Sequence, residues 1–158
     1  MPTFELATPE IWSPSERDMR EDGTMKGYGF KGVLKRFDDP KSISSEISIG
    51  ILPKEVGYDA EKHKDYKLID SPNGQYLSVP SIVPTLNDKE LTYLLSTPEE
   101  KISEKDDIMK SIRKKAVDFA KQRMDEGKPL FASPEESPMY GKPMGAKQAV
   151  KEQLKGLQ

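Results

Sequence analysis

Three glycines in the stretch MKGYGFKGVL, namely Gly27, Gly29 and Gly32, have the GxGxxG spacing of a dinucleotide-binding loop. That motif binds a pyrophosphate where a strand precedes the first glycine and a helix follows the last one. Here the polar SERDMREDGTMK precedes the glycines and the short VLKRFDDP follows them. The sequence also lacks a P-loop and the downstream motifs of a kinase. We therefore interpret the glycines as positions where the chain turns into its first strand and packs closely, and we expect no cofactor.

Acidic side chains near the first predicted hairpin could support hydrolysis of a glycan. Glu46 is placed on the solvent-facing side of a predicted strand, and Asp38 and Asp39 lie in the preceding turn. Paired carboxyl groups on either side of a glycosidic bond are the machinery of most glycosidases. With 27 acidic residues in the chain, however, such groups arise by chance, and turn formation is the simpler role for Asp38 and Asp39. The only histidine, His63, lies in the charged stretch DAEKHKDY and is predicted to be exposed, without a catalytic or metal-binding role.

The composition limits the kinds of site that the chain can build. Hydrophobic residues make up 34% and charged residues 33% of 158, so only a modest core is expected. Cysteine is absent and histidine occurs once, which excludes disulfides, thiolate metal sites and multi-histidine metal sites. The formal net charge of −2 shows no basic bias, so we expect no nucleic-acid partner. No apolar run suits a transmembrane helix and the N-terminus does not resemble a signal peptide, so no membrane association is expected.

Hydrophobic periodicity predicts an α+β fold in which a small antiparallel β-sheet of two hairpins is packed by two helices. The stretch SSEISIGIL alternates, with Ile47, Ile49 and Ile51 toward the core, and is predicted to pair with FKGVLKRF in the first hairpin. Asn73–Gly74 is typical of a type I′ turn and predicts the second hairpin. Its last strand carries Pro80 and should be an edge strand or end there. The two helices are expected over residues 87–96 and 105–126, and residues 53–66 are expected to form a loop.

The chain is expected to divide into a core with two flanking arms. We predict an extended N-terminal arm over 1–26, an α+β core domain over 27–132, a proline-rich linker over 133–145 and a short C-terminal helix over 146–158. Apolar side chains in such arms must cover either the chain's own core or a partner, and aromatic residues and methionine are common in interfaces. The candidate interface residues are Phe4, Leu6, Ile11, Trp12, Leu130, Phe131, Met139, Tyr140, Met144, Val150 and Leu154.

Four stretches in fixed order resemble a small family of proteins encoded by tailed bacteriophages, mainly short-tailed ones. They are SPSERDMREDGTMKGYGFKGVL, SSEISIGI, VPSIVPTLNDKELTYLLSTP and KAVDFAKQRMDEGKPLFA, within residues 13–132. The chain departs from the family pattern by a longer polar insert around residues 53–70, and by Asp18 and Glu21 at positions where the family has prolines. The resemblance carries no catalytic motif that could be transferred to this sequence.

The resemblance implies a phage origin and a place in the virion. The expected function is that of a non-enzymatic structural protein, made in the host cytoplasm, which binds portal, tail or capsid proteins through its arms, for example at a head–tail connector. It would occur in multiple copies in a symmetric assembly, as a homo-oligomer. Strand addition at the edge of residues 30–37 is a further expected docking mode. Two alternatives stay open: a phage-encoded hydrolase of cell-wall glycan that uses Glu46 with Asp38 or Asp39, and a phage protein that binds a host factor in the infected cell.

Overall fold

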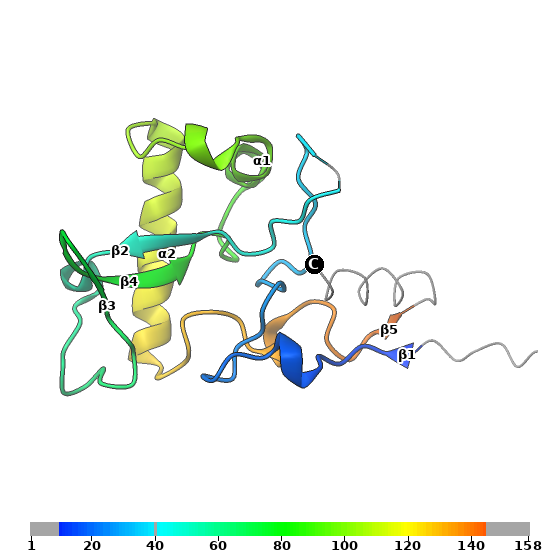
Figure 1. The fold of residues 1–158 in the computed structure, drawn as a ribbon, viewed down its shortest axis with the longest axis horizontal. Helices are drawn as coiled ribbons and strands as arrows, with labels where there is room; N and C mark the ends of the chain where they lie inside the picture. Colours follow the sequence, from blue (N-terminus) through cyan, green and yellow to red (C-terminus); the bar gives the residue numbers. More distant parts are fainter. Residues whose placement is uncertain (1–9, 40, 145–158) are drawn as a thin grey trace, which may run out of the picture.

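A long helix lies across one face of a small sheet and forms the centre of the fold (Figure 1). The computed structural model describes residues 10–39 and 41–144. The helix, α2, spans Asp107–Asp125, and the sheet consists of β2 (Ser48–Ile51), β3 (Ile69–Ser71) and β4 (Gly74–Pro80). All pairs are antiparallel and the strand order is β2–β4–β3, so β4 is the central strand. The predicted α+β class, with a small antiparallel sheet and two helices, is confirmed.

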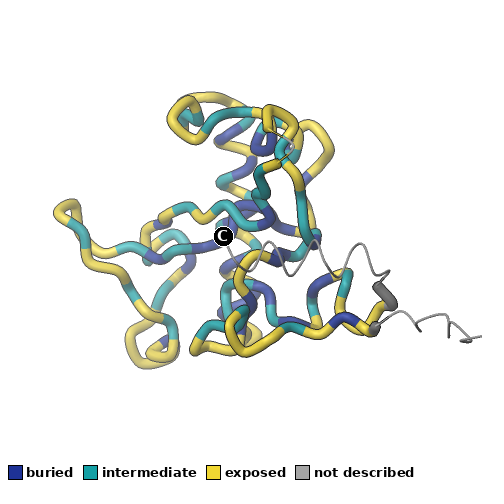
Figure 2. The backbone as a smooth tube through the Cα atoms, turned by 45° about the vertical axis from the view of Figure 1, so that its right-hand side comes forward, coloured by how far each residue is buried: buried dark blue, intermediate teal, exposed yellow. Residues whose placement is uncertain are grey.

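The remaining elements are short. A second helix, α1 (Asp88–Ser96), precedes α2, and two two-residue strands, β1 (Glu10–Ile11) and β5 (Pro143–Met144), pair with each other. Four 3-10 turns complete the described part of the chain: η1 (Glu16–Asp18), η2 (Pro53–Val56), η3 (Glu99–Lys101) and η4 (Pro134–Glu136). Exposed residues dominate the projecting loops, whereas buried residues concentrate where α2 meets the sheet (Figure 2).

The sheet is joined to α2 by the alternation that the sequence predicts. Ile51 of β2 and both Leu77 and Val79 of β4 are fully buried against Ala116 and Ala120 of α2. Because successive residues of a strand point to opposite faces, these side chains share the face that meets the helix. Each buried aliphatic side chain contributes roughly 1.5–3 kcal/mol. The opposite face of the sheet does not contact this core.

The first predicted hairpin is wrong in its pairing partner. Residues 30–37 form no strand and contribute only to two isolated bridges, Gly29–Gly32 and Lys35–Ile43. β2 pairs with β4 instead, in a register that sets Ile49 opposite Val79 and Ile51 opposite Leu77. This pairing gathers the most apolar positions of both strands on the face that α2 covers, which pairing with the basic stretch FKGVLKRF would not do. Strand addition along residues 30–37 therefore has no edge to use.

The second predicted hairpin is present, but its turn differs. β3 and β4 are paired with Ser71 opposite Gly74, so the loop residues are Pro72 and Asn73. Among the described residues only glycines have positive φ, including Gly74 at +114°, so Asn73 does not adopt the type I′ geometry. Proline at the second position and glycine at the fourth are the preferences of a type I turn. Here Pro72 decided the turn type, because its ring fixes φ at negative values.

Helix α1 closes a second apolar cluster. Asn87 caps it, since its side chain accepts the Glu90 N–H at 2.9 Å and the Glu90 carboxylate accepts the Asn87 N–H at 2.9 Å. Leu94 is buried with Ile112 of α2 and with Ile82, just after β4. Both helices lie within one or two residues of their predicted bounds, because caps and periodicity are local features of the sequence.

The described parts of the two predicted arms pack against each other rather than extending alone. Trp12 is buried with Met25 and Tyr28, and the ring centroids of Trp12 and Tyr28 are 4.8 Å apart. Backbone hydrogen bonds join the segments: Trp12 N–H donates to Lys142 C=O at 3.0 Å, and Met25 N–H donates to Ala132 C=O at 3.0 Å. In Figure 1 the two segments run side by side beside the sheet. The predicted C-terminal helix over 146–158 lies outside the described residues.

Arg123 of α2 holds the C-terminal segment against the helix. The residue is 3% exposed. Its Nε donates to the Pro129 carbonyl at 2.7 Å, and its Nη2 donates to the Phe131 carbonyl at 3.1 Å and to a Glu136 carboxylate oxygen at 2.9 Å. Its guanidinium carbon also lies 5.1 Å from the centroid of the Phe30 ring. One buried cation therefore joins α2 to segments on both sides of it in the sequence.

We expect Arg123→Ala to lower the free energy of unfolding by roughly 3 kcal/mol, because Glu136 and two carbonyls lose the cation that binds them. The control is Lys128→Ala, which breaks an exposed ion pair with Glu126 and should cost less than about 1 kcal/mol. Urea denaturation followed by circular dichroism measures both variants. Equal midpoints for the two variants would show that Arg123 is not the joint described above.

A second pair of opposite charges joins α1 to α2. Glu90 is buried, and its carboxylate accepts the hydroxyl of Ser111 at 2.6 Å and an ion pair from Lys115. Burial alone would raise the pKa of Glu90, but the hydrogen bonds from the Asn87 N–H, Lys115 and Ser111 outweigh it and hold the pKa below its usual value. The charged form is therefore the one that the folded chain stabilises.

Because the folded-state pKa of Glu90 is depressed, its contribution to stability is present above the unfolded pKa of about 4.3 and is lost as pH falls through the lower folded value. We expect the free energy of unfolding of Glu90→Gln to fall less steeply below that pH than that of the unsubstituted chain. Thermal melts across the acid range measure the slope. Parallel pH profiles for the two proteins would contradict the assignment.

Candidate functional site

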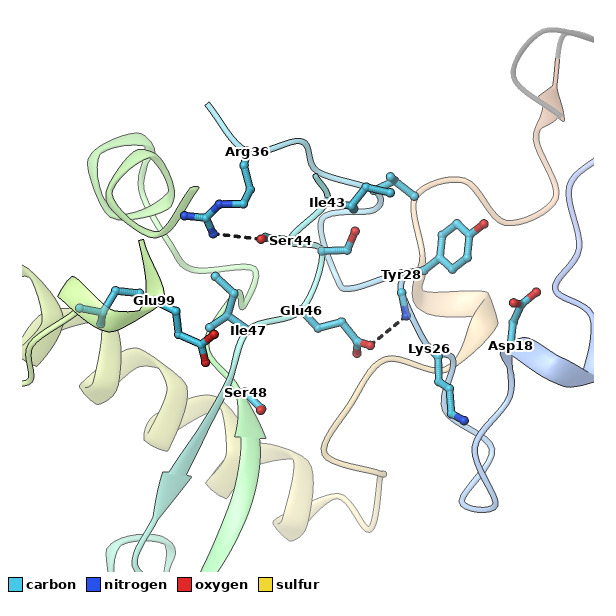
Figure 3. A pocket seen from close by; sticks show the side chains of 14 residues that line it. Asp18, Lys26, Tyr28, Arg36, Ile43, Ser44, Glu46, Ile47, Ser48 and Glu99 are labelled. Atoms are coloured by element: carbon cyan, nitrogen blue, oxygen red, sulfur yellow. Dashed lines mark hydrogen bonds between the residues drawn. The ribbon is translucent and has the colours of Figure 1, made fainter. Parts of the chain in front are cut away.

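A polar cleft of about 440 Å³ lies where the N-terminal segment meets the chain leading into β2 (Figure 3). Residues of the N-terminal segment form one side, residues that lead into β2 form the other, and η3 adds Glu99 (Figure 3). The polar and charged lining residues are Asp18, Lys26, Tyr28, Arg36, Ser44, Ser45, Glu46, Ser48 and Glu99. Both Glu46 and Gly27 of the glycine motif line this cleft, so its geometry bears directly on the catalytic hypothesis.

Glu46 is engaged by its own chain. Its carboxylate accepts Arg20 Nη2 at 2.7 Å and the Gly27 N–H at 3.0 Å. Only 10% of its side chain is exposed, although the strand alternation predicts a solvent-facing position. That prediction was wrong because Arg20 reaches Glu46 from 26 residues earlier in the sequence and covers it. A carboxylate held by a guanidinium and a backbone N–H is poorly placed to serve as nucleophile or general acid.

Asp38 and Asp39 do not complete a catalytic pair with Glu46. Neither lines the cleft. Asp39 accepts the Lys41 N–H at 3.1 Å and the Ser42 hydroxyl at 2.8 Å, which is the predicted turn-forming role. The hydrogen bond from Arg36 holds the pKa of Asp38 below its usual value, whereas a glycosidase acid needs a raised one. The geometry gives the hydrolase hypothesis no support.

Arg36 lines the cleft but also belongs to the framework. Its Nη2 donates to the Thr97 carbonyl at 2.7 Å and its Nη1 donates to the Ser44 hydroxyl at 3.1 Å (Figure 3). Thr97 directly follows α1, so the guanidinium neutralises the carbonyl end of that helix. The Nε of Arg36 also forms an ion pair with Asp38 at 2.8 Å.

The motif glycines serve close packing and turning, as interpreted from the sequence. A Cβ atom on Gly29 would lie 2.3 Å from the Ser45 carbonyl oxygen, so only glycine fits against that backbone. Gly27 and Gly32 have φ of +79° and +82°, which disfavours other residues. Gly32 N–H donates to the Gly29 carbonyl at 2.9 Å, which closes a tight turn between the cleft residues Tyr28 and Val33. The strand expected after this turn is absent.

His63 is buried, and the prediction of an exposed position was wrong. Its Nδ1 accepts the Asp59 N–H at 2.9 Å, and its ring lies between those of Tyr58 and Tyr66, with centroids 5.8 and 6.1 Å away. The charged residues around it in sequence concealed this, because the turns after η2 fold the two tyrosines over the ring. Within residues 10–39 and 41–144, no cluster of three or more metal-ligating side chains surrounds it or lies elsewhere.

Some of the predicted interface residues are brought together: Met139 packs against the cluster of Trp12, and the ring centroids of Trp12 and Tyr140 are 6.2 Å apart. Trp12 is buried inside the chain, and Leu130, Phe131 and Met139 are half-buried against neighbouring segments. Phe131 has the Arg20 guanidinium 4.7 Å from its ring centroid. Ile11 and Tyr140 are exposed near the β1–β5 pair. The backbone of Met144 lies in β5, and Phe4, Leu6, Val150 and Leu154 lie outside the described residues.

An exposed apolar row crosses the face of the sheet that α2 does not cover. Ile69 is opposite Tyr76, and continuing the β2–β4 register by one residue sets Leu52 opposite Tyr76 from the other side. Leu52 and Ile69 are 44% and 36% exposed. The Tyr76 ring also approaches Gly50 closely, where a Cβ would be 3.0 Å from it. We call Leu52, Tyr76 and Ile69 the sheet-face row; sequence analysis missed it because the row depends on the β2–β4 pairing.

Comparisons with known proteins return no relative: no protein-family model, no curated protein and no solved structure matches this chain. The resemblance to phage-encoded proteins, and the function inferred from it, therefore stay predictions. Among the helices in the described part of the chain, none has both the length and the apolar character needed to cross a bilayer.

We expect Gly29→Ala to destabilise the cleft wall, because the added methyl group overlaps the Ser45 carbonyl. Overpacking of this kind costs about 1–3 kcal/mol. Ser48→Ala is the matched control, since it changes an exposed side chain of the same cleft and should stay within about 0.5 kcal/mol. Denaturant midpoints compare the two variants. If Gly29→Ala unfolded at the wild-type midpoint, the close approach of the two segments would be incorrect.

Proposed function

We propose that this chain is a non-enzymatic structural protein of a tailed bacteriophage particle, which binds capsid, portal or tail proteins through exposed apolar side chains. The observation that carries the proposal is the sheet-face row. Contiguous apolar side chains on an uncovered sheet face are typical of protein-binding surfaces, whereas single exposed ones are common on any protein. The order of motifs within residues 13–132 supports the assignment to phage proteins.

The use of the charged residues also favours binding over catalysis. In the cleft, the side chains of Glu46 and Arg36 already form ion pairs and hydrogen bonds within the chain. The hydrogen bond from Arg36 lowers the pKa of Asp38, whereas an acid catalyst needs a raised one. A virion protein that positions its neighbours needs a rigid framework and a contact surface, and these are the features that the described residues offer.

Docking is proposed to use more than one contact. Three side chains cannot supply the roughly 800 Å² per partner that a standard stable interface buries. Ile11 and Tyr140, near the β1–β5 pair, are two further exposed apolar side chains. The proposed arms would add Phe4, Leu6, Val150 and Leu154, and many copies in a symmetric particle would multiply weak contacts.

The test is the double substitution Leu52→Ser with Ile69→Ser. Both side chains are exposed, so the thermal midpoint should stay near that of the unsubstituted chain, while affinity for the capsid, portal or tail partner should fall at least about tenfold, or about 1.4 kcal/mol. Biolayer interferometry against the purified particle proteins of the encoding phage measures this. The matched control is Phe37→Ser, which removes a 62% exposed aromatic side chain from a different loop and should leave affinity unchanged.

Two results would reject the proposal. Unchanged affinity of the double variant would remove the sheet-face row from the interface. Absence of the chain from purified particles, judged by peptide mass spectrometry, would favour the alternative in which the protein binds a host factor in the infected cell.

A further inference from the structure

The chain contains two asparagines, Asn73 and Asn87, in contrasting surroundings. Asn87 is the N-cap of α1: its side-chain oxygen accepts the Glu90 N–H at 2.9 Å, which fixes the amide in place. The following residue, Asp88, is the first residue of the helix. An amide that is held by a cap hydrogen bond is oriented away from its own backbone toward the helix end.

Asn73 lies at the tip of the β3–β4 hairpin, and both it and Gly74 are exposed. Within the described residues, no hydrogen bond holds its side chain. Gly74 has φ of +114°, and no atom lies within 4 Å of the position that a Cβ would occupy there. Gly74 therefore has no side chain of its own, and no neighbouring segment crowds the side of its Cα where a side chain would lie.

We propose that Asn73 is a site of spontaneous deamidation in the folded protein. The deprotonated peptide nitrogen of Gly74 attacks Cγ of Asn73, a new C–N bond closes a five-membered succinimide, and the side-chain nitrogen leaves as ammonia. Water then opens the ring at either carbonyl, which yields aspartate or isoaspartate. The reaction consumes one water and releases one ammonia, and it involves no oxidation or reduction.

The product alters the edge of the sheet. Isoaspartate adds a carbon to the main chain within a two-residue loop, which cannot keep Ser71 opposite Gly74. That register is held by the Ser71 hydroxyl, which donates to the Gly74 carbonyl at 2.7 Å, and by Gln75, whose Nε2 donates to Asp70 at 3.0 Å. Either product also places a negative charge three residues from Asp70. Deamidation should therefore loosen β3 while leaving β2, β4 and α2 in place.

Tryptic peptide mapping of the full chain during incubation at mildly alkaline pH tests the proposal. No lysine or arginine lies between Lys67 and Lys89, so one peptide, residues 68–89, contains both asparagines and provides its own control. We expect the mass gain from amide to acid to localise to Asn73, at a rate at least an order of magnitude above that at Asn87. Electron-based fragmentation distinguishes isoaspartate from aspartate.

Two comparisons make the result decisive. Asn73→Gln keeps a side-chain amide but requires a slower six-membered ring, so it should remove the mass gain from this peptide. In denaturant the reaction at Asn73 should accelerate, because the native pairing of Ser71 with Gly74 restrains the attacking nitrogen. The proposal is overturned if Asn73 keeps its amide in the folded chain while it deamidates in denaturant, or if both asparagines convert equally in the folded chain.

Discussion

The buried guanidinium of Arg123 is the interaction on which the rest of the structure depends. It satisfies two carbonyls and a carboxylate of the C-terminal segment and lies beside the rings of Phe30 and Phe119, which contact each other edge-on. Arginine suits this position because its planar fork donates in several directions and its faces stack on aromatic rings. Without it, α2 would keep its contacts with the sheet, but the segment that follows the helix would lose its side-chain hydrogen bonds to the end of α2 and rely on backbone contacts such as that of Met25 with Ala132.

Other arginines link distant segments of the chain in the same way. Arg20 joins the N-terminal segment to Glu46, Arg36 joins the following loop to the end of α1, and Arg113 joins α2 to the Gly50 carbonyl and Glu55. Four of the five arginines in the chain therefore connect segments that are distant in sequence. A chain with only 34% hydrophobic residues has little apolar surface with which to fix irregular segments, and charged hydrogen bonds to backbone carbonyls take over that part.

Contacts between segments that are distant in the sequence are the features that the sequence could not predict. The α1 cap at Asn87 and the periodicity of α2 are local, and both helices were predicted nearly to their ends. The alternation of Ile49 and Ile51 was predicted as well, but not the strand that would pair with them, because many partners satisfy an alternating pattern. The burial of Glu46 and His63 was missed for the same reason, since each depends on a residue or turn brought in by the fold. Of the candidate site, the role of the glycines was predictable, whereas the sheet-face row was not.

The charged side chains that link segments and the exposed apolar side chains have different roles, and this difference bears on function. Charged groups that hold segments together cannot also exchange protons with a substrate without loosening the joint that they form. Leu52 and Ile69, in contrast, make no comparable contribution to the core, because α2 covers the other face of their sheet. Their apolar surface is left free to be buried by something else. Ile11 and Tyr140 occupy the β1–β5 end, from which the chain continues toward Phe4 and Leu6 on one side and Val150 and Leu154 on the other. A partner that covered both regions would gain apolar area without disturbing any of the arginine joints, so binding and folding would be separable in this molecule.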